Sequence, residues 1–274
     1  MWKSILCLSF LISSLAQANI YPDSANQRRA LTGAEKQHLL HLGDLGKGGC
    51  SASALTPNTL ITAEHCSALT TGYFELDSSK TFKIVKILDV SSHYEGDVMV
   101  AQIAWTDGAA PTLLLYPREL ANTESQLKFG SDSEATPLFS LGYPRDLEKR
   151  ATYSSGFLKT TKLYPSFSVA DPYTHQAVRA ALYLRVNVPL INGNSGGPVY
   201  TANYKLVGIV SNGTAPVSDE EMKSPSYNSQ NPLYWNQLGA LYFLYPQMKT
   251  LQTIFPNGVN PNVNENGEWI GKSN

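Results

Sequence analysis

The stretch INGNSGGPVY, from Ile191 to Tyr200, decides how the rest of the chain is interpreted. Gly, Asn and Ser favour turns because they tolerate positive φ or hydrogen-bond to their own backbone, and the final VY is typical of a strand that follows. A second interpretation makes Ser195 a nucleophile on this turn, with free backbone N–H groups beside it. That chemistry needs a base and an orienting carboxylate elsewhere in the chain.

Candidates for the base and the carboxylate both precede the turn. His65 ends the strand-like run LITAEHC, one residue before Cys66, and Asp97 begins the run DVMVAQI. Asp89 is the competing carboxylate, and we interpret it as a residue at the end of a strand. Each signal is weak alone, but the joint order His65, Asp97, Ser195 indicates a nucleophilic site.

The other histidines are given structural roles. His38 and His41 are three residues apart, a spacing that matches no closed set of metal ligands, so packing or surface exposure is favoured. His93 and His175 lie in polar segments and are expected to face solvent. The sequence therefore predicts neither a metal site nor a cofactor.

The N-terminus is typical of a secretory signal peptide. Residues 1–18 read MWKSILCLSFLISSLAQA, with Lys3 ahead of an apolar run and Ala16-Gln17-Ala18 as a cleavage motif. The apolar run is too short to span a membrane. We expect cleavage after Ala18 and a secreted or periplasmic product.

Removal of the signal peptide, which contains Cys7, leaves Cys50 and Cys66 as the remaining cysteines. An even number of cysteines in an exported protein implies a disulfide. The sequence therefore predicts a bond between these two residues, across a short loop.

Composition is compatible with a folded protein that has a substantial core. Of the 274 residues, 42% are apolar and 16% are charged, and the formal net charge is −1. We predict no basic face for nucleic acid and no membrane association once the signal is removed.

Short β-rich runs separated by turn residues continue through most of the chain, which indicates antiparallel barrels or sandwiches. The run GALYFLY, residues 239–245, is interpreted as a strand, and Pro246 as the opening of a helix that continues through Phe255. Arg28-Arg29 lies in a polar arm that is interpreted as solvated rather than as a processing site. The tail after residue 256 is expected to be loose.

Three motifs together resemble the trypsin/chymotrypsin-like serine peptidase family. CSASALTPNTLITAEHC, DVMVAQI and GNSGGP are similar to its cysteine–histidine hairpin, its aspartate strand and its nucleophile turn. LGYP at 141–144 and Asn194 favour the bacterial glutamyl-endopeptidase-like branch. The resemblance spans roughly residues 48–255.

This resemblance implies an all-β fold of two six-stranded antiparallel β-barrels with a short C-terminal helix. The expected segments are a signal peptide (1–18), an N-terminal arm or propeptide (19–33), a first barrel (34–118), a second barrel with the C-terminal helix (119–256) and a polar tail (257–274).

The resemblance also implies roles for individual residues. Ser195 is expected to attack the scissile carbonyl, His65 to act as general base, and Asp97 to orient the imidazole. The backbone N–H groups of Gly193 and Ser195 are expected to form the oxyanion hole. The enzyme is expected to need no cofactor and to act as a monomer on protein or peptide substrates.

Substrate-binding residues are implied as well. Ser211-Asn212-Gly213 is expected to pair with the substrate backbone, and Gly213 and Gly239 to form the walls of the specificity pocket. Pro189 occupies the position of a basic-residue-binding Asp in trypsin-like members, and Val210 that of a His in glutamyl-specific ones. These departures favour an apolar or small residue before the scissile bond.

Two further departures concern activation and the base. Asn194 replaces an Asp that pairs with a freed N-terminus in many animal members, and Glu64 replaces a small residue before His65. The segment 214–238 is long and contains Asp219, Glu220 and Glu221, and we interpret it as a solvated acidic loop. Glu64 and this segment leave a catalytically silent binding module with the same fold as the main alternative. An esterase of the α/β-hydrolase type is disfavoured because its histidine would come last in the chain.

Overall fold

A computed structural model describes residues 28–44, 49–92, 95–121, 135–144, 151–165, 182–213, 235–258, 260 and 262–270. The predicted signal peptide and the first part of the predicted arm lie outside these residues, as does most of the segment 214–238.

The first half of the chain forms a closed antiparallel barrel. Its strands are β2 (Leu40–Leu42), β3 (Cys50–Thr56), β4 (Thr59–Thr62), β5 (Thr71–Phe74), β6 (Asp77–Ser91) and β7 (Val98–Trp105). They follow the order β2-β3-β4-β7-β6-β5, and pairing of β2 with β5 closes the barrel. The expected hairpin forms between β3 and β4, with Ser53 opposite Ile61.

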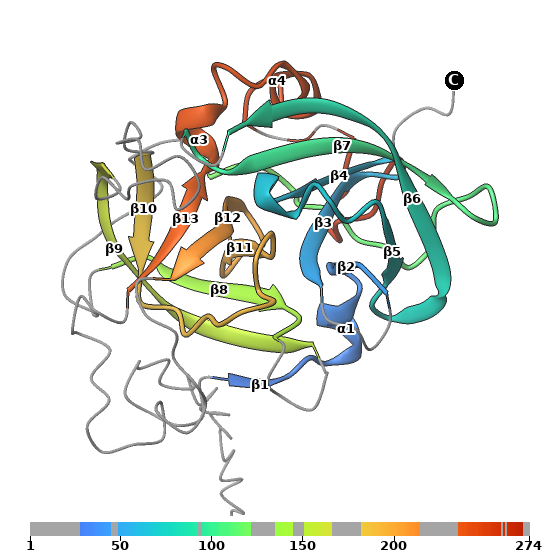
Figure 1. The fold of residues 1–274 in the computed structure, drawn as a ribbon, viewed down its shortest axis with the longest axis horizontal. Coiled ribbons are helices and arrows are strands. Elements are labelled where there is room, and N and C mark those ends of the chain that lie inside the picture. Colours follow the sequence, from blue (N-terminus) through green and yellow to red (C-terminus); the bar gives the residue numbers. More distant parts are fainter. Residues whose placement is uncertain are drawn as a thin grey trace, which may run out of the picture.

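The second half forms another six-stranded barrel. Its strands are β8 (Pro137–Gly142), β9 (Thr152–Pro165), β10 (Leu182–Val186), β11 (Pro198–Thr201), β12 (Leu206–Gly213) and β13 (Asn236–Ala240). They follow the order β9-β10-β13-β12-β11-β8, closed by pairing of β8 with β9. Figure 1 shows the two barrels side by side. The predicted fold of two six-stranded antiparallel barrels is confirmed.

The interiors of the barrels are apolar, and β7 illustrates why its sequence forms a strand there. Its first four residues are all buried, and Ile103 and Trp105 alternate with more exposed neighbours toward its end. This pattern suits a strand that enters the core at one end and borders solvent at the other. The polar Asp97, directly before this strand, is therefore carried into the interior.

The described helices are short, and the last two of them differ from what the sequence predicts. The strand predicted over 239–245 ends at Ala240, and α3 (Leu241–Leu244) follows it. Leu241 and Leu244 are both buried and lie three positions apart, which suits one face of a helical turn. An apolar run of this length is compatible with either element, so its sequence pattern does not distinguish them.

The last helix, α4 (Lys249–Ile254), begins after Pro246 and not at it. Asp89, on β6, accepts a hydrogen bond from the backbone N–H of Thr250 over 2.5 Å. This carboxylate therefore caps the first turn of α4 from outside the helix, as an N-cap side chain would. Asp89, the competing carboxylate in the sequence, has this structural role. The described residues also contain α1 (Gly33–Lys36) and the 3-10 turn η1 (Glu64–Cys66).

The described part of the C-terminal tail is packed, which corrects the expectation of a loose segment. Val263 forms a β-bridge with Trp269, and the backbone N–H of Tyr116 donates to the carbonyl of Gly267 over 2.9 Å. The rings of Tyr116 and Trp269 meet edge to face, with centroids 5.9 Å apart. Backbone pairing and one aromatic anchor therefore hold a segment whose composition is polar.

The solvated arm expected around Arg28-Arg29 is instead a strand. Residues Arg28–Ala30 form β1, which pairs antiparallel with β9 of the second barrel, with Arg29 opposite Tyr153. Figure 1 shows β1 along the lower edge of that barrel, while α4 lies near β6 and β7 of the first. Each barrel therefore contacts a terminal segment that follows or precedes the other barrel in the chain.

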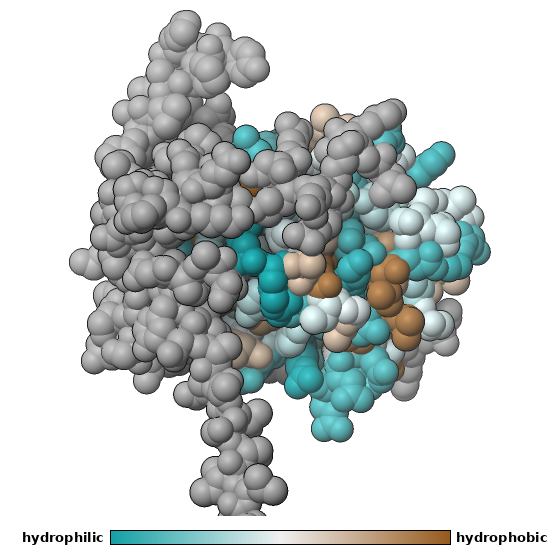
Figure 2. All heavy atoms as spheres, turned by 90° about the horizontal axis from the view of Figure 1, so that it is seen from below, coloured by the Kyte–Doolittle hydropathy of each residue, from teal (hydrophilic) through white to brown (hydrophobic). Residues whose placement is uncertain are grey.

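The large exposed apolar side chains of the described residues are Val85, Ile87 and Val90 on β6, together with Leu113 and Ile270. Figure 2 shows the described part of one face as a mixture of hydrophilic and intermediate side chains with small hydrophobic spots. None of the described helices has the length and apolarity to cross a membrane.

Candidate active site

Asp97 sits at the junction of the two barrels in an unusual backbone conformation. Its φ is +56°, its side chain is fully buried, and Gly96 before it has a φ of +156°. Gly239 of β13 packs against this turn, because a Cβ there would lie 2.2 Å from the Gly96 carbonyl oxygen. The absence of a side chain at 239 thus permits the second barrel to approach the Asp97 turn.

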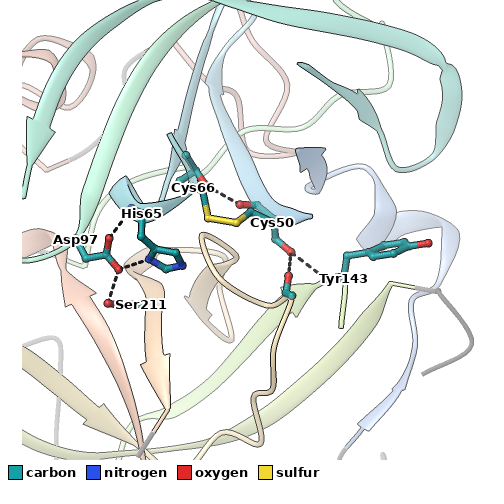
Figure 3. The surroundings of a disulfide bond; sticks show 9 residues. Cys50, His65, Cys66, Asp97, Tyr143 and Ser211 are labelled. Atoms are coloured by element: carbon teal, nitrogen blue, oxygen red, sulfur yellow. Dashed lines mark hydrogen bonds and ion pairs between the residues drawn. A yellow bond between two sulfur atoms is a disulfide. The ribbon is translucent and has the colours of Figure 1, made fainter. Parts of the chain in front are cut away.

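Both carboxylate oxygens of Asp97 contact His65. Oδ2 lies 2.7 Å from Nδ1 of the imidazole, and Oδ1 accepts the backbone N–H of His65 over 3.0 Å. Nδ1 therefore carries the proton, and Nε2 of neutral His65 is left as a base. Figure 3 shows the His65 ring between Asp97 and the disulfide.

Ser211, on β12, donates its hydroxyl to Oδ2 of Asp97 over 2.5 Å. The buried carboxylate is thus held from the first barrel by His65 and from the second by Ser211. Tyr183 lies in the same environment, where burial raises the pKa of its phenol to about 12, a hydrogen bond with Ser211 opposes that shift and the charge of Asp97 adds to it.

The predicted disulfide is present beside the imidazole. Cys50 of β3 and Cys66 of η1 are bonded, with their Cα atoms 6.2 Å apart. Their sulfurs and His65 form the one cluster of potential metal ligands among the residues described. Because both sulfurs are joined to each other, they are not available as thiolate ligands. The bond therefore anchors the backbone that carries His65.

The turn that holds Ser195 depends on two glycines with positive φ. Gly193 has φ +97° and Gly196 has φ +75°, and a Cβ on Gly196 would lie 2.0 Å from the hydroxyl oxygen of Thr62. Residues with a side chain rarely adopt this part of φ space. The glycines in this stretch therefore serve both a turn conformation and close packing against β4.

Most backbone N–H groups in this turn are used for its own structure. Those of Asn194, Gly196 and Gly197 donate to the carbonyls of Ile191, Val210 and Asn194 over 2.8–3.0 Å. The N–H groups of Gly193 and Ser195 have no acceptor within the part of the chain that the structure describes. Two adjacent free donors are what an oxyanion site requires.

His65, Ser195 and Gly193 line a single cleft of about 700 Å³. The disulfide forms part of its wall, together with Thr70 and Thr71 from the first barrel and Asn192 from the second. The structure thus brings the predicted base, nucleophile and oxyanion donors to one cavity. The His65 side chain is 34% exposed, so it is accessible from that cavity.

The predicted specificity residues lie in the second barrel. Pro189 is buried after β10, and Gly239 is buried in β13. Asn212 and Gly213 pair with Gln237 and Asn236 in the β12–β13 ladder. Residues 214–234 of the acidic segment lie outside the described residues. The roles of Gly213 and Gly239 as walls of a specificity pocket remain predictions.

Asn194 is fully buried within the turn that holds Ser195. Its Oδ1 accepts the backbone N–H of Ile191 over 3.4 Å, and its amide group fills the space beside Gly142, where a Cβ would lie 2.3 Å from Nδ2. Gly142 belongs to the LGYP motif, so one function of that motif is to accommodate this side chain. Glu64, before His65, donates its backbone N–H to the carbonyl of Asp97 over 3.2 Å.

His38 and His41 are packed in the interior, which decides between packing and surface exposure, the two roles that the sequence left open. His38 stacks on Tyr204 with ring centroids 4.3 Å apart, and His41 meets Tyr73 and Tyr143 at 4.7 and 4.5 Å. Burial lowers the pKa of both imidazoles to about 4. His93 and His175, expected to face solvent, lie outside the described residues.

Ser51, a residue of β3 that was not predicted from the sequence, contacts the turn that holds Ser195. Its backbone N–H donates to the carbonyl of Ser195 over 2.7 Å, and its hydroxyl donates to the carbonyl of Gly193 over 3.1 Å. In the sequence it appears only as a small residue after Cys50, so no local pattern distinguishes it from other strand residues.

Comparison with known proteins gives a family match and a fold match. A family model described as "Trypsin-like peptidase domain" matches residues 50–209. No curated protein matches the chain.

Similar solved structures include a serine-to-alanine mutant of Rv3671c from M. tuberculosis H37Rv, in an inactive form. The two chains are 16% identical, the match covers 80% of this chain and 90% of that chain, and the TM-score is 0.50. The MamO protease domain from Magnetospirillum magneticum has 14% identity, coverage of 77% and 96%, and a TM-score of 0.50. A mutant of human heparin binding protein (CAP37) has 13% identity, coverage of 85% and 98%, and a TM-score of 0.56. At such identities the likeness shows the fold alone.

Proposed function

Because this chain belongs to the trypsin-like peptidase domain family, we propose that it is an exported serine endopeptidase that cleaves peptide bonds through an acyl-enzyme. The observation that carries the proposal is the buried Asp97 carboxylate 2.7 Å from Nδ1 of His65, in a molecule where His65 and Ser195 line one cleft. Burial of a carboxylate is costly, and here the charge is paired with an imidazole that lines the cleft.

In the proposed first step, Nε2 of His65 accepts the Ser195 hydroxyl proton as Oγ attacks the scissile carbonyl. Asp97 keeps the proton on Nδ1 and stabilises the imidazolium that forms. The free N–H groups of Gly193 and Ser195 stabilise the oxyanion of the tetrahedral intermediate. His65 then gives its proton to the leaving amine, and the acyl-enzyme remains.

In the second step water takes the place of the amine. Nε2 of His65 accepts a proton from that water, whose oxygen attacks the acyl carbonyl, and the proton returns to Ser195 Oγ as the acid product leaves. The same two N–H groups stabilise the second tetrahedral intermediate. No cofactor is required at either step.

Export and specificity form part of the proposal. The Cys50–Cys66 disulfide fits an oxidising compartment, and the predicted signal peptide over 1–18 would deliver the chain there. We assign the protein to the glutamyl-endopeptidase-like branch on Asn194 and LGYP, and we propose an apolar or small residue before the scissile bond because Pro189 offers no charge.

The test is cleavage of a mixed peptide library by the purified, disulfide-intact protein, with Ser195→Ala as the control. We expect cleavage that is lost in the variant, and a mass increase on Ser195 after treatment with a serine-directed acylating inhibitor. A folded wild-type protein that neither cleaves nor becomes acylated would overturn the proposal in favour of a non-catalytic binding module.

A further inference from the structure

Ser51 uses its backbone N–H and its hydroxyl to join the two barrels at the turn that holds Ser195. Besides its two bonds to the turn, its hydroxyl oxygen accepts the backbone N–H of Tyr143 over 2.9 Å, and its carbonyl accepts the Thr62 hydroxyl over 2.8 Å. The residue is fully buried. Figure 3 shows the hydrogen bonds that link this region to Tyr143, beside the Cys50–Cys66 disulfide.

The direction of the hydroxyl proton is fixed by this arrangement. Because the Tyr143 N–H donates to the Ser51 oxygen, the single hydroxyl proton is left to donate to the Gly193 carbonyl. Tyr143 lies directly after β8, in the LGYP motif of the second barrel. The second barrel therefore orients the hydroxyl of Ser51 in the first barrel, and that hydroxyl holds the turn of Gly193 in the second barrel.

The bonds from Ser51 restrain two peptide units of the turn. The peptide that joins Gly193 to Asn194 is held at its carbonyl by the Ser51 hydroxyl and at its N–H by the Ile191 carbonyl. The peptide that joins Ser195 to Gly196 is held at its carbonyl by the Ser51 N–H and at its N–H by Val210.

The oxyanion donors are next to these restrained units. Gly193 has positive φ and no side chain, so its backbone rotates more easily than that of other residues. The Gly193 N–H belongs to the preceding peptide unit, which is joined to the Gly193 carbonyl through the Gly193 Cα, so a fixed carbonyl limits the rotations by which that N–H can turn away from an oxyanion. The hydroxyl of Ser51 opposes those rotations from a rigid, buried strand.

We propose that Ser51 is a positioning residue of the oxyanion hole: its hydroxyl fixes the Gly193 peptide so that the N–H groups of Gly193 and Ser195 converge. This role rests on the proposed peptidase function and deepens it. Ser51 is fully buried and is not among the residues that line the cleft, so its effect on the reaction is expected to pass through the turn.

The decisive comparison is Ser51→Ala against Ser53→Ala. Ser53 is two residues further along β3, is equally buried, and shares a hydrogen bond of 2.8 Å with the Tyr200 hydroxyl, away from the turn. Both variants lose one buried hydroxyl and its hydrogen bonding, so a general loss of stability would affect both. We expect kcat to fall about tenfold in Ser51→Ala, with KM changed less than about twofold, and both constants to be near wild-type in Ser53→Ala.

A second pair of variants isolates the hydroxyl if Ser51→Ala folds poorly. Ser51→Thr and Ser51→Val have nearly the same shape and differ by a hydroxyl against a methyl group. We expect the Thr variant to have about tenfold higher kcat than the Val variant.

Inhibitor binding separates a role in the oxyanion hole from a role in substrate binding. A boronic acid based on the best-cleaved peptide forms a tetrahedral adduct on Ser195, whereas the matching product peptide does not. Loss of the Ser51 hydroxyl should lower the affinity for the boronic acid by about the same factor as it lowers kcat. The affinity for the product peptide should stay unchanged.

The outcomes distinguish the two proposals. An active wild-type protein with unchanged kcat and boronic acid affinity in Ser51→Ala, or with equal losses in Ser53→Ala, would overturn the role of Ser51 alone. A wild-type protein that neither cleaves peptides nor becomes acylated would overturn the peptidase function, and this role with it.

Discussion

The guanidinium of Arg29 forms a bidentate ion pair with the carboxylate of Glu35, over 2.7 and 2.5 Å. The same guanidinium lies 4.1 Å from the centre of the Tyr153 ring, and Glu35 also accepts the backbone N–H of Thr32 at the start of α1. The hydrogen bond with Glu35 raises the pKa of Arg29. Arg29 is thus a structural residue that ties β1 to α1 and β9.

Arg29→Ala should therefore leave peptidase activity intact. The side chain of Arg29 is 44% exposed but that of Glu35 only 10%, so loss of the pair should cost about 1–3 kcal/mol of unfolding free energy, because the buried carboxylate loses its partner. Activity of the variant and the N-terminal sequence of the active wild-type protein check this. A variant that stays inactive until it is trimmed at this point would show that cleavage after Arg29 is required for activation.

Replacement of Asp97 by Asn should lower kcat/KM by about 10⁴, because the amide favours the wrong imidazole tautomer. Asp89→Asn is the matched control, since Asp89 is a carboxylate of the first barrel that caps α4 and lies outside the cleft. Steady-state kinetics of both variants provide the measurement. A loss below tenfold in Asp97→Asn would show that this carboxylate does not orient the base.

Loss of the disulfide should destabilise the protein by about 3 kcal/mol, the value that chain entropy gives for a loop of this size. The sequence separation of Cys50 and Cys66 is 16, and both are buried. Urea unfolding of the Cys50→Ser/Cys66→Ser variant gives the magnitude. Because His65 precedes Cys66, activity should also fall in the folded variant, and unchanged stability and activity together would contradict the expected anchoring role.

The stability of the fold should decrease in acid because of His38 and His41. Burial lowers the pKa of His38 from 6.5 to about 4; the charge of Arg118 adds to this shift and that of Glu35 opposes it. Burial alone lowers the pKa of His41 to a similar value. Between these values the unfolded chain binds more protons than the folded one, so unfolding free energy should fall as pH decreases from 6.5 to about 4, by roughly 3 kcal/mol per histidine.

The variant His38→Phe isolates this effect, since it keeps an aromatic ring beside Tyr204 and removes the titration. Its unfolding free energy should depend less on pH between 4 and 6.5 than that of the wild type. The difference between the two curves matters because Glu75 acts in the opposite sense: burial raises its pKa to about 7, and the nearby Lys36 opposes that shift. Two parallel curves would exclude His38 as a source of acid sensitivity.

The parts of the candidate site that follow local patterns were predictable from the sequence. His65 and Asp97 stand at ends of strands, and the pairing of β4 with β7 brings those ends together, with Thr62 opposite Met99. The turn at Ser195 is recognisable from its glycines, and two of them, Gly193 and Gly196, have positive φ in the structure. Each of these signals depends on neighbours within a few residues.

Contacts between distant segments were not predictable in the same way. Ser51 and Gly193 are separated by 142 positions, and Ser211 and Asp97 by 114. A serine that donates across a barrel interface has the same local context as one that merely fills a strand. The prediction of a strand over 239–245 was wrong for a different reason, because successive apolar residues suit a buried strand and a buried helix equally well.

The positions of β1 and α4 have a consequence for cooperativity. The first strand of the described chain completes an edge of the second barrel, and the final helix rests on β6 of the first, where Asp89 caps it. A fragment that contains only the first barrel would lack α4, and a fragment that contains only the second barrel would lack β1. Thermal melting should accordingly show one transition for both barrels, and a gene cut between them should yield two fragments that are soluble only when produced together.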